Sequence, residues 1–324
     1  MTTKIPVSSL IVLLVALLHS GSLLSADDTQ KNGELTIYDR PTSIGIVAKR
    51  EFHDTEGRVI KTHYYRYNFK ASAGEMFDES GPYTEENLIL DSVRTKEYND
   101  DNRLIRRNRY DENMELQGWA EFKENTTLSR RSDGTRNIET RSEGDRQLST
   151  LYFDQTGENL IAINGEVPGD IEFSGGWGKQ VDGLVCGVGL NQSKGQLGEI
   201  RFYVTIRNMT DTSRRFITSI AYHQIQVELL DAEGNVMPQD NEHIKQRKEK
   251  LVRINRGINE NRQLLRPQQA RITSGGYVLK DWYSDIPAGT YFLTVKQRTD
   301  DSSFALVSHP VELEIVAKDE SEHQ

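Results

Sequence analysis

Histidine, cysteine and carboxylate side chains are the groups in this sequence that could perform chemistry. The seven histidines show no pairing at i and i+4 and no His-Glu-x-x-His motif, so we expect no metal site. No Gly-x-Ser-x-Gly motif, phosphate-binding loop or dinucleotide-binding glycine pattern follows a predicted strand. We therefore predict no catalytic residues and no cofactor, in a protein that is not an enzyme.

The 49 acidic residues are numerous enough for a paired-acid glycosidase, but no two of them stand out by position. Asp231 begins the segment Asp-Ala-Glu-Gly-Asn, which resembles the start of a calcium loop. Later oxygen ligands and a closing bidentate glutamate are missing, so a hairpin turn is the better interpretation. A glycan-active hydrolase stays as the weakest of three functional alternatives.

The single cysteine, Cys186, lies in an apolar segment and has no partner for an internal disulfide. We expect a small, buried hydrophobic side chain and not a reactive thiol. A secreted protein of this length would then depend on core packing for its stability.

The first 26 residues have the order of charge, apolar run and small residues that is typical of an export signal. Lys4 precedes the apolar run 10–18, which is shorter than the roughly 20 residues that span a bilayer. We expect a signal peptide at 1–26, a secreted or periplasmic mature chain, and no membrane span after cleavage. Cleavage after Ser22 is an alternative to cleavage after Ala26.

From Tyr38 to about Ile163 the chain repeats one theme: an aromatic residue, a polar turn with Asp or Asn, and a short alternating strand. Clear copies begin at Phe52, Glu97, Arg109 and Tyr152. Regular turns with period-two alternation between them predict successive antiparallel β-hairpins.

Within these copies, residues 54–60 and the pair Tyr110-Asp111 resemble the YD-repeat, or RHS-type, repeat, in which Tyr-Asp and a polar turn precede Gly-Arg-Leu and a strand. Asn102 replaces the glycine before Arg103. The resemblance implies an extended hairpin array, too short here to close into the shell of the large members. Its aromatic and arginine side chains would either form a flat binding face or fill a thin core and pair across strands.

A run of arginines in this region, Arg103, Arg106, Arg107 and Arg109, looks like a basic patch. Alternation along a strand divides such a run between two faces. Aspartates and glutamates on either side of it would neutralise most of its charge.

Pro168 and five glycines between residues 165 and 179 predict a linker. Residues 180–318 then read as alternating strands separated by turn residues. Arg207-Asn208, residues 265–267 and residues 285–291 resemble the immunoglobulin-like or fibronectin-like modules of bacterial exported proteins. That resemblance implies a β-sandwich and carries no function.

The predicted fold class is therefore all-β: an antiparallel β-hairpin repeat array at 27–164, a linker at 165–179, an immunoglobulin-like β-sandwich at 180–318, and a tail at 319–324.

A basic segment interrupts the second half, and apolar spacing within it permits a short amphipathic helix. Its candidate partner-binding cations are Lys245, Arg247, Lys248, Lys250, Arg253 and Arg256. Two interpretations stay open. The segment is either a docking surface, for an anionic glycan, a phosphate-rich polymer or the acidic first half of the chain, or a solvated stretch whose cations pair with nearby carboxylates. The excess of acids in the first half does not favour nucleic acid as a partner.

We expect an exported, non-enzymatic binding or scaffold protein of the cell envelope that recognises a protein or glycan partner. The alternative is a secreted enzyme inhibitor or accessory protein. In that alternative, Trp282 and Tyr283 lie on an exposed loop and insert into a partner enzyme. The sequence leaves the identity of the partner and the oligomeric state open.

Overall fold

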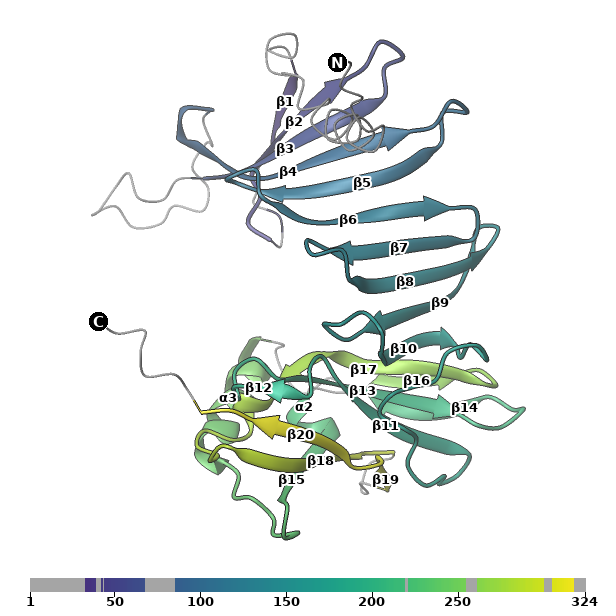
Figure 1. Ribbon diagram of the computed structural model, residues 1–324, viewed down its shortest axis with the longest axis vertical. Coiled ribbons are helices and arrows are strands. Elements are labelled where there is room, and N and C mark those ends of the chain that lie inside the picture. The colour runs from purple at the N-terminus through teal and green to yellow at the C-terminus, as the bar shows by residue number, and fades with distance from the viewer. Residues whose placement is uncertain are drawn as a thin grey trace, which may run out of the picture. The chain divides into compact units, whose positions relative to one another are not determined.

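The computed structural model describes residues 33–38, 42, 44–67, 85–218, 221–254, 261–299 and 305–317 (Figure 1). The predicted signal peptide at 1–26 and the tail at 319–324 lie outside the described residues. The chain divides into two compact units, Met1–Gln117 and Gly118–Gln324. Antiparallel strands predominate in both, which confirms the predicted all-β class.

The first unit is an antiparallel meander in which each strand pairs with the next one along the chain. Its elements are β1 (Glu34–Ile37), β2 (Ala48–His53), β3 (Val59–Tyr67), the 3-10 turn η2 (Glu85–Asn87), β4 (Leu88–Tyr98) and β5 (Leu104–Asp111). Among its described residues, the buried apolar side chains are Ile46, Val47, Ala48, Phe52 and Val93. Most of the other side chains are partly or fully exposed, so this sheet presents polar surface.

The second unit begins with a further meander and ends in two facing sheets. Its first sheet runs β6 (Leu116–Lys123), β7 (Thr126–Arg131), β8 (Arg136–Glu143), β9 (Arg146–Phe153), β10 (Leu160–Glu166), β17 (Gln269–Val278), β13 (Arg201–Asn208) and β11 (Leu184–Leu190). The division between the units falls within β6. The other sheet runs β12 (Lys194–Gly195), β20 (Val311–Ile315), β18 (Gly289–Gln297) and β15 (Ile225–Asp231), with β19 (Leu306–Val307) beside β18. The remaining elements are the pair β14 (Arg214–Thr218) and β16 (Asn261–Leu265), the helices α2 (Ala221–Gln224) and α3 (Asn241–Ile254), and the 3-10 turn η3 (Leu279–Asp281).

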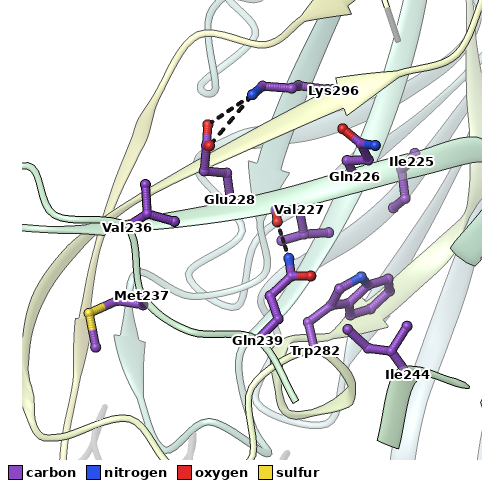
Figure 2. A pocket seen from close by; sticks show the side chains of 10 residues that line it. All are labelled: Ile225, Gln226, Val227, Glu228, Val236, Met237, Gln239, Ile244, Trp282 and Lys296. Atoms are coloured by element: carbon purple, nitrogen blue, oxygen red, sulfur yellow. Dashed lines mark hydrogen bonds and ion pairs between the residues drawn. The ribbon is translucent and has the colours of Figure 1, made fainter. Parts of the chain in front are cut away.

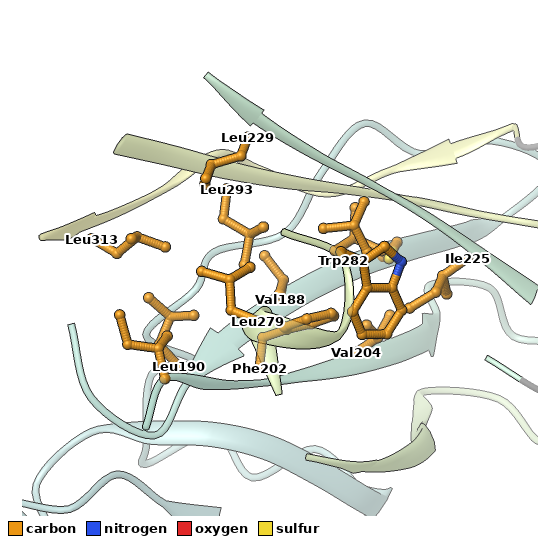
Figure 3. Close-up of a cluster of buried hydrophobic side chains, with 14 of the residues drawn as sticks. Val188, Leu190, Phe202, Val204, Ile225, Leu229, Leu279, Trp282, Leu293 and Leu313 are labelled. Carbon is orange, nitrogen blue, oxygen red and sulfur yellow. The ribbon is translucent and has the colours of Figure 1, made fainter. Parts of the chain in front are cut away.

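The core of the second unit lies between the two facing sheets (Figure 3). Leu190 and Phe202 come from one sheet, and Leu229, Leu293 and Leu313 come from the other. All of these side chains are buried, so apolar contact between the inner faces holds the sheets together.

One hairpin turn recurs along the chain. Asp54, Asp111 and Asp231 each open such a turn, and their Oδ1 atoms accept backbone N–H groups two and four residues later. The fourth residue lies in the left-handed region, with φ of 79° at Gly57 and 85° at Gly234. The segment at Asp231 is therefore the expected hairpin turn, and the described residues contain no group of three or more metal-ligating side chains.

The turn between β9 and β10 depends on Asp154, a buried carboxylate. It accepts hydrogen bonds from Asn159 Nδ2 at 2.7 Å, Thr156 Oγ1 at 2.7 Å and the Gly157 backbone N–H at 3.0 Å. Burial alone would raise the pKa of Asp154, but the hydrogen bonds together outweigh it and hold the pKa below its usual value.

We expect Asp154→Ala to lower the free energy of unfolding by about 2 kcal/mol at neutral pH, because several donors lose a charged acceptor. The folded-state pKa lies below the unfolded one, so this contribution is present above the unfolded pKa and is lost as pH falls through the folded value. Urea unfolding at neutral and strongly acidic pH measures it. Glu158→Ala, an exposed acid in the same turn, is the control. If the free energy of unfolding of Asp154→Ala differed from that of the parent by the same amount at both pH values, the role of the ionised carboxylate would be contradicted.

The predicted linker at 165–179 lies within the second unit and packs into its structure. Phe173 is buried, pairs by a β-bridge with Leu160 and stacks on Trp177 with ring centroids 4.6 Å apart. The backbone N–H of Gly178 donates to the carbonyl oxygen of Cys186 at 2.8 Å. This stretch is thus part of the packed structure, while the predicted domain boundaries stay a prediction.

Cys186 is fully buried on β11, which confirms its interpretation as a small core side chain. Burial raises the pKa of its thiol to about 12. We expect alkylation of the native protein near pH 8 to be at least ~100-fold slower than alkylation in urea, because both access and thiolate are lacking. Mass spectrometry after timed labelling measures the ratio, and equal rates would show that β11 is not held in this core.

Candidate functional site

A surface pocket of about 290 Å³ lies in the second unit, at the outer edge of β15 (Figure 2). Its apolar walls come from Val227 on β15, from Val236 and Met237 in the segment that follows β15, from Ile244 on α3, and from Trp282. Met237 and Ile244 pack against the core, whereas Val236 is 62% exposed. The pocket therefore combines a fixed apolar wall with an accessible rim.

The strand edge beside the pocket is covered by side chains and loop backbone. Among the described strands, β15 lies at one edge of its sheet, opposite β12, and pairs with β18. The carbonyl oxygen of Val227 accepts hydrogen bonds from the side-chain amide of Gln239 and from the Tyr283 hydroxyl, the latter at 3.4 Å. The Met237 N–H donates to Leu229 O at 2.8 Å. These contacts occupy carbonyl groups of β15 and so limit the pairing of this edge strand with strands of other chains.

The rim of the pocket carries one ion pair. Lys296 Nζ lies 3.3 Å from Glu228 Oε2 (Figure 2), and each side chain is about one-third exposed, at 36% and 32%. An ion pair this open to solvent adds little stability.

Helix α3 forms one side of the pocket. Asp240 caps its start, since Oδ1 accepts the His243 backbone N–H at 2.9 Å, and this hydrogen bond is the main reason why the pKa of Asp240 lies below its usual value. Arg247 on α3 lies 2.8 Å from Asp281 in η3. The cap, the ion pair and the packing of Ile244 together hold the helix against the pocket.

The predicted amphipathic helix in the basic segment is confirmed over Asn241–Ile254. Lys245 and Arg247 are exposed and Lys248 is half-buried, but Arg247 is engaged with Asp281. Lys250 and Arg253 lie in α3, although their side chains lie outside the described set, and Arg256 lies outside the described residues altogether. The structure thus places the first cations of the segment on the helix whose Ile244 lines the pocket.

The exposed loop predicted for Trp282 and Tyr283 is wrong, because the two rings are only 3% and 1% exposed. The turn η3 folds this segment back into the core, where Trp282 packs edge-on against Phe202 and Tyr277 at centroid distances of 5.3 and 5.5 Å. Neither ring is available for insertion into a partner enzyme. Trp282 instead closes the inner wall of the pocket.

Sequence reasoning missed Val236, Met237 and Gln239, which form the rim and cover the strand edge. The available signal was an apolar pair placed directly after the Asp231 turn, where a polar loop would be ordinary. Glu228 and Lys296 carry no sequence signal, because their pairing depends on the register of β15 with β18.

Comparison with protein-family models finds no match, and comparison with curated protein sequences finds none either. Among solved structures, a β-glucosidase from Erythrobacter marinus aligns over 41% of this chain and 15% of its own, with 11% identity and a TM-score of 0.24. This likeness is too low to support any conclusion about fold or activity. In the described part of the chain, no helix has the length and hydrophobicity needed to cross a bilayer.

Proposed function

We propose that this chain is an exported, non-catalytic binding or scaffold protein of the cell envelope, and that it recognises a protein partner at the pocket beside α3. The observation that carries the proposal is a pocket with an exposed apolar rim at Val236 and a wall formed by Ile244 of α3, the helix that also carries the cations Lys245 and Lys248. A partner segment with an apolar side chain flanked by acidic residues would match this surface.

The arrangement of the strands supports a recognition role for the two units. Repeated hairpins with Asp-led turns are compatible with a YD-like or RHS-like array, and the facing sheets around the core of the second unit are compatible with an immunoglobulin-like sandwich. Both families present surfaces on rigid β-scaffolds. Export follows from the signal predicted at residues 1–26.

Capture of partners from an envelope extract of the source organism tests the proposal. The bait is the mature chain, compared with Lys245→Glu/Lys248→Glu and with Val236→Asp. A second charge reversal on exposed lysines of the same unit, Lys123→Glu/Lys179→Glu, is the matched control.

We expect one protein to be retained by the parent and the control and to be lost with both site variants. If the control variant also failed to capture the protein, the loss would be an effect of net charge and not of this surface. Equal capture by all four baits would overturn the assignment of this surface.

A further inference from the structure

A hollow of about 300 Å³ lies in the first unit, beside the end of β5. We call it the β5 hollow. It is lined by charged and polar residues of that unit alone: Arg66, Asp91, Ser92, Arg109, Tyr110, Asp111, Glu112 and Gln117. Ligand sites in proteins range from about 300 to 1,000 Å³. The β5 hollow is at the small end of this range, so its occupant is a small ligand or the end of a larger one.

The register of the strands places charged side chains of the hollow on one face of the sheet. Ser92 pairs with Asp111 and, on its other side, with Tyr64. Paired residues lie on the same face of a sheet, and so do alternate residues along a strand. Arg66, two residues after Tyr64, and Arg109, two residues before Asp111, therefore lie on this face as well.

A β-bulge adds a carboxylate to the same wall. The pairing of β3 with β4 shifts by one residue at Asp91, which has no partner on β3. Bulges redirect side chains and are common beside functional sites. Asp91 Oδ1 lies 2.5 Å from Arg66 Nε, and Asp91 Oδ2 accepts a hydrogen bond from the Ser92 hydroxyl at 3.1 Å. The bulge thus fixes a carboxylate and a guanidinium against each other.

The wall contains both engaged and free charges. Asp111 accepts two backbone N–H groups of its own turn and the side-chain amide of Gln117, the latter at 2.9 Å. Arg109 and Glu112 are exposed, and within the described residues no salt bridge or side-chain hydrogen bond engages either of them. The hollow therefore offers one free guanidinium and one free carboxylate beside a fixed polar wall.

The charges of the hollow nearly balance, and this balance selects the chemistry of a ligand. A ligand carboxylate would face three carboxylates, and a ligand ammonium would face two guanidinium groups. An apolar ligand would leave these groups unpaired. Guanidinium groups only donate hydrogen bonds and carboxylates only accept them, whereas a hydroxyl group does both. Adjacent hydroxyl groups on an uncharged ligand therefore satisfy both kinds of group at once.

We propose that the β5 hollow binds a neutral saccharide, and that Arg109 and Glu112 contact adjacent hydroxyl groups of the sugar. The ion pair of Arg66 with Asp91 keeps the wall in place, so little order has to be gained on binding. Because the ligand is uncharged, the formal net charge of −9 of the whole chain neither attracts nor repels it. The hollow belongs to the other unit from the pocket beside α3 and does not depend on it.

Saturation-transfer NMR with the mature chain tests the proposal. The probes are the neutral trisaccharides maltotriose, cellotriose, mannotriose and galactotriose. We expect saturation transfer to at least one of them, with an affinity that changes less than about twofold between roughly 50 and 500 mM salt, because an uncharged ligand makes no ion pair that salt could screen. Arg109→Gln/Glu112→Gln removes the free guanidinium and the free carboxylate and leaves the net charge unchanged. We expect its affinity for the bound trisaccharide to fall at least about tenfold.

Arg103→Gln/Glu86→Gln is the matched control, because it makes the same two changes at exposed positions of the same unit that do not line the hollow. It is expected to bind the trisaccharide within about twofold of the parent. Exposed side chains contribute little to stability, so both variants are expected to melt at the temperature of the parent. The melting temperature thus separates lost binding from lost folding.

Saturation transfer to none of the trisaccharides would overturn the proposal. So would unchanged affinity in a folded Arg109→Gln/Glu112→Gln, or an equal loss of affinity in the control. Saturation transfer to free glutamine, a zwitterion, but to no trisaccharide would assign the hollow to amino acids instead. Capture of a protein partner at the pocket beside α3 plays no part in these measurements, so the two proposals are tested separately.

Discussion

Replacing Trp282 by alanine is expected to lower the free energy of unfolding of the second unit by about 4 kcal/mol, in the range found when large buried aromatic side chains are truncated. The indole ring packs edge-on against both Phe202 and Tyr277 and is 3% exposed. Its loss leaves a cavity in the core and removes the inner wall of the pocket.

Urea unfolding followed by circular dichroism measures this change. Trp282→Phe retains an aromatic ring in the same place and is expected to cost less than half as much. A loss below about 1 kcal/mol for the alanine variant would show that the ring is not part of the core.

Replacing Gly175 by alanine is expected to lower the free energy of unfolding by about 3 kcal/mol, because overpacking displaces backbone that has no room to move. A Cβ atom at Gly175 would lie 1.7 Å from the carbonyl oxygen of Val188 and 2.6 Å from its carbonyl carbon. The segment that carries Phe173 would therefore have to move off β11.

Gly169→Ala is the matched control in the same segment, since a Cβ there meets nothing within 4 Å. It is expected to be neutral or slightly stabilising, because alanine restricts the unfolded chain. Equal urea midpoints for Gly175→Ala and the parent would contradict the close packing of residues 165–179 on β11.

Local chemistry explains which features the sequence could predict. Aspartate followed by a glycine specifies a hairpin turn within five residues, so the turns at Asp54 and Asp231 were predictable. The burial of Cys186 followed from its apolar neighbours, and helix α3 followed from the spacing of its apolar residues. Each of these features depends on neighbours in sequence alone.

The features that sequence reasoning missed depend on distant residues. An aromatic pair in a polar segment has the same sequence whether it is exposed or folded inward, and only the turn η3 places Trp282 against Phe202. The ion pair of Arg66 with Asp91 needs the register of β3 with β4. Similarly, β15 becomes a strand edge only when strands far along the chain have been ordered into sheets.

Photo-crosslinking from position 236 tests most directly whether the pocket beside α3 binds a partner. A benzophenone amino acid replaces Val236 at the exposed rim or, as the control, Ser132 in an exposed turn of the same unit. We predict one crosslinked protein from position 236 in envelope extract, absent from position 132 and lost when Lys245→Glu/Lys248→Glu is added. The same products from both positions, or none from position 236, would contradict a partner-binding role for this surface.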